Sequence, residues 1–391
     1  MPQISERSQQ FTESVIRSMT RIADRHGAIN LSQGFPDFDP PRELMDALAR
    51  VGHEGPHQYE ITFGAQAFRE ALARKQSLSI SRAIDPDSEV LVTCGATEAM
   101  ICAMLAVINP GDKVGIFSPY YENYAADCII AGAQAVYVPL IPPEYTVDWQ
   151  ALERAFQDGI KAMVVCNPSN PCGKVFTSDE LLAIGRLALR HGAWVITDEV
   201  YEHIVYAPHR HTSLAGLPGM WGNTLTVSSL SKTYSITGWR LGYLIGPEKA
   251  VEAARKVHDF LTVGAAAPLQ AAALPGLRSG PAYYQGLRDL YTEKREYFLS
   301  GLDAIGLPHN MPQGSYFVLV DVGRFLDLPR FAGYDGLAFC EFMAEHISVA
   351  AVPGSSFFPD SAGDRLVRLH FARGLDSLNE ALKRLGRLND L

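Results

Sequence analysis

One lysine stands among residue types that suit nucleophilic chemistry. Lys232 lies in Ser228–Tyr243, SSLSKTYSITGWRLGY, directly after a short apolar run typical of a buried strand. Ligand sites of α/β sheets gather at the carboxyl ends of strands. A partly desolvated lysine keeps its amine available near neutral pH, and Ser229, Ser231 and Arg240 could bind a phosphate. The segment predicts a nucleophilic amine beside an anion site; a lysine at a solvated surface turn is the plainer alternative.

Two further polar motifs follow predicted strands. Asp198 lies in Trp194–His203, WVITDEVYEH, where an aspartate either caps a helix or presents its carboxylate to a ligand. Asn170 lies in Asn167–Gly173, NPSNPCG, whose prolines and asparagines predict a turn with or without a function. Both motifs are expected at the same edge of a sheet as the lysine.

A turn of small residues joins a predicted strand, Glu89–Thr93, to a predicted helix, Thr97–Val107. Gly95, Ala96 and Thr97 would offer backbone N–H groups and the positive end of the helix dipole to a phosphate. Every parallel sheet has such turns, so this signal is weak by itself.

An arginine stands inside an apolar strand pattern near the C-terminus. Arg368 lies within Leu366–Arg373, LVRLHFAR. A strand arginine usually faces solvent, whereas a buried one needs a carboxylate partner. Arg365 and Arg373 are competitors in the same segment, and the alternation of the strand favours Arg368.

The elements that would hold these residues form an α/β pattern. Seven runs of strand length are separated mostly by segments of helix length: Glu89–Thr93, Lys113–Phe117, Gln134–Val138, Lys161–Cys166, Ala193–Thr197, Thr224–Ser228 and Leu241–Ile245. Nearly continuous apolar strands between helices predict a mainly parallel sheet that is buried on both faces.

The pattern changes after Pro268, and this change predicts a second, smaller α+β domain. Long helical stretches are followed by a strand at Ser315–Val320, a helix near Gly336–His346 and a late strand at Arg365–Phe371. We divide the chain into 1–40, an N-terminal arm with a helix at Glu13–His26 and part of the small domain; 41–290, the large domain; and 291–391, the C-terminal small domain.

Composition excludes several classes of protein. The 391 residues are 47% hydrophobic and 20% charged, with a net charge of −9, which argues against nucleic acid or anionic membranes as partners. The sequence opens without a signal-peptide pattern and has no apolar run of membrane-spanning length. Six scattered cysteines without a CxxC pair favour reduced thiols and a cytoplasmic location over disulfides or a zinc site: Cys94, Cys102, Cys128, Cys166, Cys172 and Cys340.

Taken together and in this order, the motifs resemble class I/II aminotransferases, which are fold-type-I enzymes that depend on pyridoxal 5'-phosphate. The resemblance extends from SQGFPDF to LHFAR. It implies a large domain with a mainly parallel seven-stranded sheet and a smaller α+β domain. It also implies that Lys232 holds the cofactor as a Schiff base and later moves the Cα proton, that Arg240 and Ser229 bind the phosphate, and that Asp198 faces the pyridine nitrogen.

The resemblance implies roles for residues beyond these. Tyr201 and Asn170 would contact the cofactor O3′; Gly95, Ala96 and Thr97 would form the phosphate cup; Tyr121, in preference to Tyr120, would stack on the pyridine ring; Gly34, Asn170 and Arg368 would bind the substrate carboxylate; and Tyr59 would reach the phosphate of a neighbouring subunit. The last role implies a homodimer. Cys172 stands where the family usually has threonine, which puts the local turn in question.

The resemblance is closest to the kynurenine, glutamine and methionine aminotransferases. Leu261–Gln270, the segment expected to face the partner's pocket, has no arginine for an acidic side chain. We therefore expect a neutral, bulky or apolar amino donor, a 2-oxo acid acceptor and ping-pong kinetics. The alternatives are an aspartate-type aminotransferase, a β-lyase acting on cysteine conjugates with the same cofactor, and a non-catalytic protein that keeps the fold.

Overall fold

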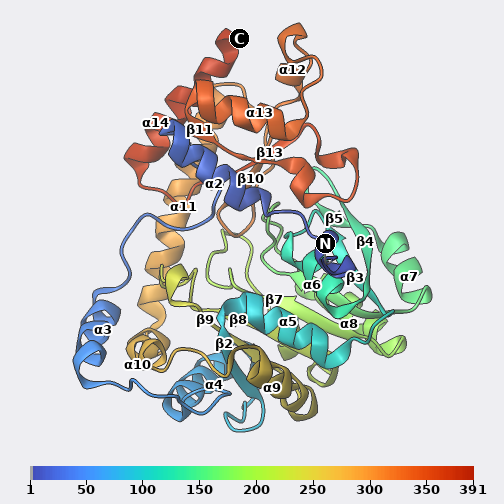
Figure 1. Cartoon of the computed structure of the whole chain (residues 1–391), viewed down its shortest axis with the longest axis vertical. Helices are drawn as coiled ribbons and strands as arrows, with labels where there is room; N and C mark the ends of the chain where they lie inside the picture. The colour runs from blue at the N-terminus through green and yellow to red at the C-terminus, as the bar shows by residue number, and fades with distance from the viewer. Residues whose placement is uncertain (1–2) are drawn as a thin grey trace.

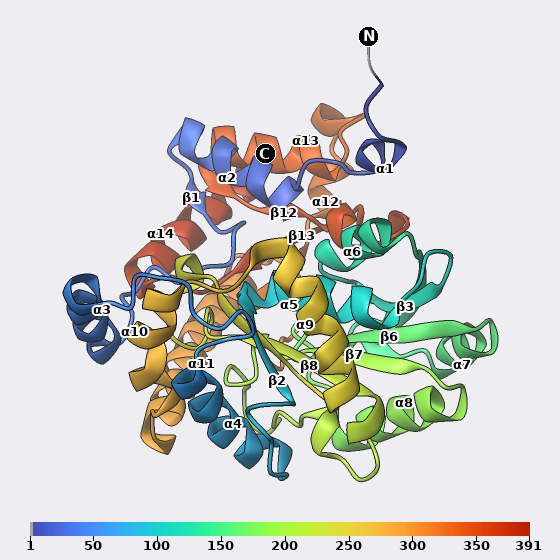
Figure 2. The ribbon, with the colours of Figure 1, turned by 60° about the horizontal axis from the view of Figure 1, so that its bottom comes forward.

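The computed structural model describes residues 3–391 and has two parts, each built around a sheet (Figure 1). The larger part surrounds an eight-stranded sheet, and the smaller part surrounds a three-stranded sheet. Figure 2 shows the N-terminal helix α2 (Val15–His26) lying with the smaller part, next to the C-terminal helices. Segments from both ends of the chain therefore form one layer above the large sheet.

The large sheet is mainly parallel. Its strand order is β2-β9-β8-β7-β6-β3-β4-β5, and β9 runs antiparallel to both of its neighbours. The bounds are β2 Val90–Cys94, β3 Lys113–Ser118, β4 Gln134–Ile141, β5 Thr146–Val147, β6 Ile160–Cys166, β7 Trp194–Asp198, β8 Thr224–Ser229 and β9 Leu241–Ile245. Because β2, β6, β7 and β8 point the same way, the residues that follow them meet at one edge of the sheet.

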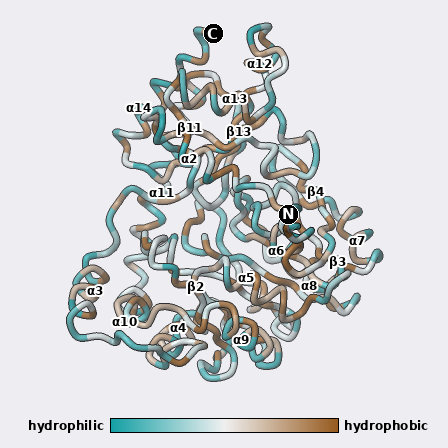
Figure 3. Tube along the Cα trace, viewed as in Figure 1, coloured by the Kyte–Doolittle hydropathy of each residue, from teal (hydrophilic) through white to brown (hydrophobic). Residues whose placement is uncertain are grey.

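Helices cover both faces of the large sheet, as expected for parallel strands that are apolar on both sides. One face packs against α5, α6 and α9, and the other packs against α4, α7, α8 and α10. The bounds are α4 Gln66–Ile80, α5 Gly95–Val107, α6 Asn123–Ala131, α7 Trp149–Gln157, α8 Ser178–Arg190, α9 Glu248–Thr262 and α10 Ala267–Leu277. Hydrophilic residues concentrate on the outer helices and loops (Figure 3).

The smaller part joins the C-terminal third of the chain to the N-terminal arm. Its antiparallel sheet has the order β10-β13-β12, and β1 pairs with β11. The strands are β1 Ile29–Asn30, β10 Phe317–Asp321, β11 Val349–Ala350, β12 Val352–Pro353 and β13 Leu366–His370; besides α2, the helices are α1 Glu6–Gln9, α11 Pro281–Ala304, α12 Gly323–Leu326, α13 Gly336–Phe342 and α14 Leu375–Gly386. Helix α3, Arg42–Glu54, packs against α10 beside the large sheet (Figure 1).

The fold class that the sequence predicts is confirmed, with one more strand than expected. The eighth strand, β5, has two residues, Thr146 and Val147, and pairs antiparallel with β4 after a turn. The predicted helix near Gly336–His346 consists of α13 and a following π-helical turn, Met343–Ile347. Helix α11 continues without a break through the predicted boundary at residue 290, and the division into domains stays a prediction.

Two observations bear on the environment of the chain. All six cysteines are free, and five of them are buried. Within residues 3–391, no helix is both long enough and apolar enough to cross a membrane.

Candidate active site

A cavity of about 470 Å³ lies where the carboxyl edge of the large sheet, the small sheet and the N-terminal arm meet. Eleven of the residues predicted from the sequence line it: Gly34, Ala96, Thr97, Tyr121, Asn170, Asp198, Tyr201, Ser229, Lys232, Arg240 and Arg368. Gly95 directly precedes Ala96 at the first turn of α5. The structure thus brings together side chains that are up to 334 positions apart in the sequence (from Gly34 to Arg368).

Lys232 lies at the centre of the cavity, just after β8. Its Nζ donates a hydrogen bond of 3.0 Å to the carbonyl oxygen of Gly34, which also accepts one from the hydroxyl of Tyr316. Burial, followed by the charges of Arg240 and Arg368, lowers the pKa of Lys232 to about 8. A substantial fraction of neutral amine is therefore present near neutral pH, as a nucleophile or a proton acceptor needs. The alternative of a solvated surface turn is wrong.

Asp198 is the last residue of β7 and pairs in register with Cys166 of β6. The hydroxyl of Tyr124 donates to its Oδ2 at 2.8 Å, and the N–H of Val200 donates to Oδ1 at 3.3 Å. Burial raises the pKa of Asp198 to about 6, although the Tyr124 hydrogen bond opposes this shift. A carboxylate held this way at the floor of a cavity could pair with a cationic ring nitrogen. The positive charge of that nitrogen would lower the pKa of Asp198 again.

Sequence analysis missed Tyr124. It lies three residues after Tyr121, a spacing that brings two side chains to one face where the chain is helical. The rings of Tyr121 and Tyr124 meet edge to face, with their centroids 5.8 Å apart. This spacing is the signal that could have identified Tyr124.

The anion end of the cavity depends on close approach of backbone segments. Gly95 has φ +83°, and a Cβ at this position would clash with Nη2 of Arg240. A Cβ at Gly242 would in turn clash with the backbone of Gly95 and Ala96. Only glycines therefore allow Arg240 to lie against the first turn of α5. Arg240 itself has φ +53°, an uncommon conformation that places its guanidinium beside the helix N-terminus.

Arg368 forms the opposite end of the cavity and is 1% exposed. Its Nη1 donates to Oδ1 of Asn170 at 2.8 Å, and its Nη2 donates to the carbonyl oxygen of Ser32 at 2.7 Å. Burial lowers the pKa of Arg368 to about 10, so it remains a cation at neutral pH. Its buried Nε has no hydrogen-bond partner within residues 3–391. A buried guanidinium without a carboxylate partner suits an anionic substrate group.

The competing arginines of the same strand have other partners. Arg365 forms a bidentate ion pair with the exposed Asp327, at 2.6 and 2.9 Å. Arg373 donates to the carbonyl oxygen of Asn30 at 3.0 Å. The strand register therefore places Arg368, and neither neighbour, in the cavity.

Aromatic rings form the wall between the two ends. The ring of Tyr201 meets those of Tyr316 and Phe317 edge to face, with centroids 5.3 and 5.9 Å apart. Burial raises the pKa of Tyr121, which lines the cavity, to about 12. Tyr120 instead stacks on Tyr137 at 4.9 Å, outside the cavity. Phe317 is the first residue of β10 and Tyr316 directly precedes it; neither was predicted from the sequence as a site residue.

The N-terminal arm covers part of the cavity. Ser14, Ile16 and Arg17 at the start of α2 line it, and none of the three was predicted. The hydroxyl of Ser14 donates to Glu122, at the start of α6, and also accepts the N–H of Arg17 as a helix cap. This bridge ties the arm to the large sheet across the mouth of the cavity.

Tyr59 is the predicted site residue that the chain does not bring to the cavity. Its side chain is 91% exposed, in the loop before α4. A single chain thus gives Tyr59 no contact with the other site residues.

The cavity has the groups that pyridoxal phosphate requires. An amine with a lowered pKa, a buried carboxylate, and an arginine held against a helix N-terminus fit its aldehyde, pyridine nitrogen and phosphate. When bound, the cofactor withdraws electrons from the substrate Cα. The residues present therefore fit the group.

Comparisons with known proteins agree with this geometry. The family model for aminotransferase class I and II matches residues 26–385. The chain is 36% identical to a methionine aminotransferase of Escherichia coli, over 97% of each chain, and 32% identical to mouse kynurenine–oxoglutarate transaminase 3, over 96% of this chain and 88% of that protein.

The similarity extends to solved structures. The structure of an N-succinyldiaminopimelate aminotransferase from Mycobacterium tuberculosis matches with a TM-score of 0.92 and 36% identity, covering 99% of this chain and 100% of that one. The match spans both sheets and the arm, and therefore the whole cavity. The chain belongs to the class I and II aminotransferases and is a pyridoxal-phosphate-dependent enzyme that transfers amino groups.

Proposed function

We propose that Lys232 is the catalytic residue, which bonds the cofactor aldehyde and, once released, takes the substrate Cα proton at its Nζ. Its lowered pKa and its place between the two ends of the cavity support this role. Asp198 holds a proton on the pyridine nitrogen, and Asn170 and Tyr201 contact the cofactor oxygen. Tyr121 stacks on the ring.

In this proposal, each of the two arginines binds a different anionic group. Arg240, with Ser229 and the first-turn N–H groups of α5, holds the phosphate. Arg368, with Asn170 and the backbone at Gly34, orients the substrate α-carboxylate. With the cofactor held at one end and the substrate carboxylate at the other, the Cα proton would lie close to Lys232, and this positioning favours its transfer.

We further propose that the amino donor is neutral and bulky or apolar, of the methionine, glutamine, aromatic or kynurenine type, and that the acceptor is a 2-oxo acid. The observation that carries this proposal is the apolar part of the cavity lining, which consists of Ile16, Phe35, Val200 and Phe317, the last in contact with the guanidinium of Arg368. An acidic side chain beside these residues would lose its hydration without gaining a partner.

One observation favours a second candidate, a donor with a distal carboxylate. Arg17 lines the cavity mouth, and its guanidinium makes no hydrogen bond or ion pair with any residue in 3–391. Arg17 lies outside Leu261–Gln270, the segment in which the sequence offers no arginine for an acidic side chain. A donor that reaches past the apolar wall could place its carboxylate there, as an aspartate-type or a longer acidic substrate would.

A half-reaction screen tests both candidates. Each amino acid is mixed with the cofactor-loaded enzyme without an acceptor, and the loss of visible cofactor absorbance is followed. We expect methionine, glutamine, phenylalanine or kynurenine to react at least about tenfold faster than aspartate or glutamate. Faster reaction of an acidic donor, reduced by Arg17→Gln while methionine is unaffected, would establish the second candidate. Pyruvate and ammonia released from a cysteine conjugate would instead show β-elimination.

A homodimer is the assembly that we propose. Tyr59 and Ile61 are exposed in one loop, and Phe260, Leu261 and Val263 are exposed at the end of α9; Phe260 is 91% exposed. The two segments are adjacent because His258 of α9 contacts the carbonyl oxygen of Thr62. An exposed apolar and aromatic surface of this kind is typical of an interface, and a second copy would bring Tyr59 to its partner's phosphate. Sedimentation of the full chain checks this: a monomer at micromolar concentration would contradict it.

A further inference from the structure

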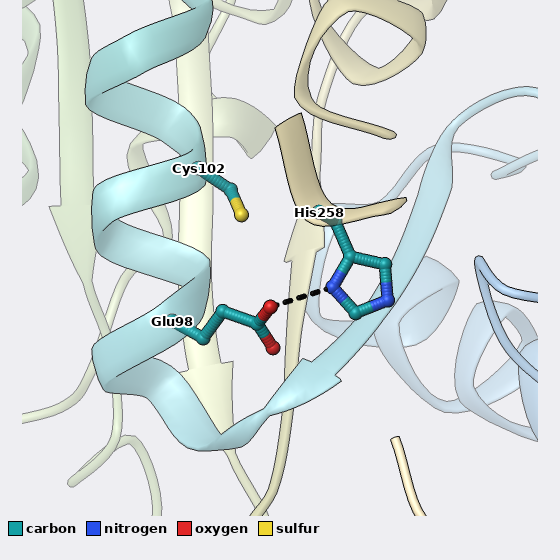
Figure 4. Close-up of side chains that lie close together, drawn as sticks. All are labelled: Glu98, Cys102 and His258. Atoms are coloured by element: carbon teal, nitrogen blue, oxygen red, sulfur yellow. Dashed lines mark hydrogen bonds and ion pairs between the residues drawn. The ribbon is translucent and has the colours of Figure 1, made fainter. Parts of the chain in front are cut away.

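A buried acid–base pair lies directly beneath the first turn of α5 (Figure 4). Glu98 belongs to that turn, and His258 projects toward it from α9. The Nδ1 atom of His258 lies 2.8 Å from Oε1 of Glu98, and the two side chains are 0% and 8% exposed. None of the proposed catalytic roles uses this pair.

The hydrogen bonds around the pair fix its protons. Nε2 of His258 lies 2.8 Å from the carbonyl oxygen of Thr62, which can only accept, so Nε2 carries a hydrogen. Nδ1 faces Glu98, whose carboxylate already accepts the hydroxyl of Thr262 and the N–H of Cys94. A bare Nδ1 lone pair against a carboxylate oxygen would be repulsive. One further proton must therefore lie between Glu98 and His258, and the pair as a whole has no net charge.

The charge distribution follows from the surroundings. Burial disfavours the charged form of Glu98, but hydrogen bonds from His258, Thr262 and the Cys94 N–H lower its pKa below the usual value. Burial likewise disfavours charge on His258, but Glu98 raises its pKa above the usual value. The pair is an imidazolium with a carboxylate.

A metal ion is the competing explanation for this cluster. One ligand atom each of Glu98, Cys102 and His258 lies within 4.8 Å of the others. Both ring nitrogens of His258, however, are already hydrogen-bonded, and Nε2 faces a backbone oxygen. Burial raises the pKa of Cys102, which keeps its thiol protonated and a poor ligand. The hydrogen-bonded pair accounts for each of these contacts without a metal.

The pair matters because it lies next to the proposed phosphate site at the first turn of α5. The carboxylate of Glu98 is in the same helical turn whose N–H groups, at Gly95, Ala96 and Thr97, form the phosphate end of the cavity. An unpaired carboxylate there would repel a phosphate dianion through a poorly screened interior and would offset the helix dipole.

We propose that His258 is a positioning residue for the cofactor phosphate: it neutralises Glu98 while Glu98 caps the backbone below the site. This inference rests on the phosphate site proposed above. It makes phosphate affinity depend on the proton of a residue that never touches the phosphate. Loss of that proton leaves Glu98 as a bare anion under the α5 turn.

The groups that face the pair come from three elements. They are Asp259 on α9, Cys102 on α5 and Cys94 at the end of β2, and Arg240, before β9, acts on Cys94. Asp259 raises the pKa of His258, and Arg240 lowers that of Cys94. Within the pair, His258 is the group that loses its charge as pH rises through its raised pKa.

A comparison of two ligands separates this electrostatic role from a structural one. The full-length chain, freed of cofactor, is titrated with pyridoxal 5'-phosphate and with pyridoxal, which lacks the phosphate, and visible absorbance reports binding. We expect His258→Gln to weaken pyridoxal phosphate about tenfold and pyridoxal less than about twofold. The double variant Glu98→Gln/His258→Gln has no charge to compensate, and we expect it to recover most of the affinity.

The pH dependence gives a second test that needs no substitution. In the wild type, the ratio of the two affinities should fall as pH rises through the raised pKa of His258, because the folded pair then loses its proton. The ratio cancels the titration of Lys232, which both ligands share. Above about pH 7, where the phosphate is a dianion, the double variant should show a flat ratio.

Several results would overturn the inference. The first is an equal loss of affinity for both ligands in His258→Gln, and the second is no recovery of affinity in the double variant. The third is a bound metal whose removal by a chelator lowers the affinity of the wild type for pyridoxal phosphate. Circular dichroism of each variant identifies unfolding, in which case the pH ratio of the wild type decides. Failure of wild-type chain to bind either ligand would instead contradict the proposed cofactor site.

Discussion

The two ends of the cavity are built in different ways. At the phosphate end, the α5 turn follows β2, Ser229 ends β8, and Arg240 directly precedes β9. These three strands are hydrogen-bonded neighbours, in the order β2-β9-β8. At the carboxylate end, Arg368 comes from β13 of the small sheet, Asn170 from the loop after β6, and the Ser32 carbonyl from the arm.

This difference indicates what each end can tolerate. The phosphate end is fixed by the hydrogen bonds of one sheet and by contacts between backbones, so added volume disrupts it. The carboxylate end joins three separate segments through one guanidinium, so its geometry depends on how the small sheet and the arm lie over the large sheet. Changes at the first end should affect cofactor affinity, and changes at the second should affect the substrate.

Lys232 belongs to neither end, and its replacement should have the largest effect. Lys232→Ala removes the amine that we propose takes the Cα proton but leaves both arginines in place. We expect transamination to fall at least about 10³-fold, measured as steady-state oxo-acid formation. Phosphate-dependent binding of the cofactor should persist. Turnover close to that of the wild type would show that another group takes the proton.

Arg368 tests the carboxylate end. Arg368→Gln leaves Asn170 and the substrate without a cation, and a loss of about 2 to 5 kcal/mol corresponds to at least about a 30-fold fall in kcat/KM. Cofactor affinity should change little. The matched control is Arg365→Gln, which removes an exposed ion pair between Asp327 and the residue directly before β13. A larger kinetic effect from the control would mean that the wrong arginine has been assigned.

Gly95 tests the phosphate end. Gly95→Ala places a Cβ against the guanidinium of Arg240, and we expect about tenfold weaker cofactor binding with donor KM nearly unchanged. Gly111→Ala is the control: Gly111 also has a positive φ, +87°, but no atom lies within 4 Å of the added Cβ. If both variants weaken cofactor binding equally, the loss comes from backbone strain at a positive φ and not from the contact with Arg240.

The smallest expected effect is a shift in pH dependence at Asp198. Tyr124→Phe removes a donor that favours the carboxylate, so the pKa of Asp198, about 6, should rise. The acid limb of the kcat/KM profile should move up by about one pH unit.

Because the pKa of Asp198 is above its unfolded value, its protonation stabilises the fold below the unfolded pKa, and this stability is lost as pH rises through about 6.

A control distinguishes this hydrogen bond from general packing. Tyr121→Phe removes a neighbouring hydroxyl that makes no contact with Asp198, and its acid limb should stay in place. The same shift in both variants would rule out the specific role of Tyr124.

Sequence was most informative where a motif follows a strand directly. Asp198 ends a buried strand, and Lys232 and Asn170 lie in the loops that follow two others, so neighbouring parallel strands carry all three to one edge of the sheet. Arg368 was predicted from the register of the late strand together with the family resemblance, and in the structure its competitors Arg365 and Arg373 have other partners.

Residues that depend on packing between distant segments were missed. Ser14 and Arg17 line the cavity because α2 packs on the small sheet, and Tyr316 reaches Gly34 from β10. No local pattern encodes such a meeting. The two-residue strand β5 was missed because its pairing with β4, and not its own composition, defines it. Tyr59 stays a prediction, since a single chain cannot supply its partner.

The arm across the cavity mouth has a consequence for how such enzymes diverge. Ser14, Ile16 and Arg17 line the cavity, whereas the residues proposed to be catalytic come from the two sheets and the loops that follow their strands. Mutations at these positions can therefore alter substrate preference in a lineage while the chemistry is inherited unchanged. Mutant libraries confined to residues 14–17 would be a direct way to change which amino acids this enzyme accepts.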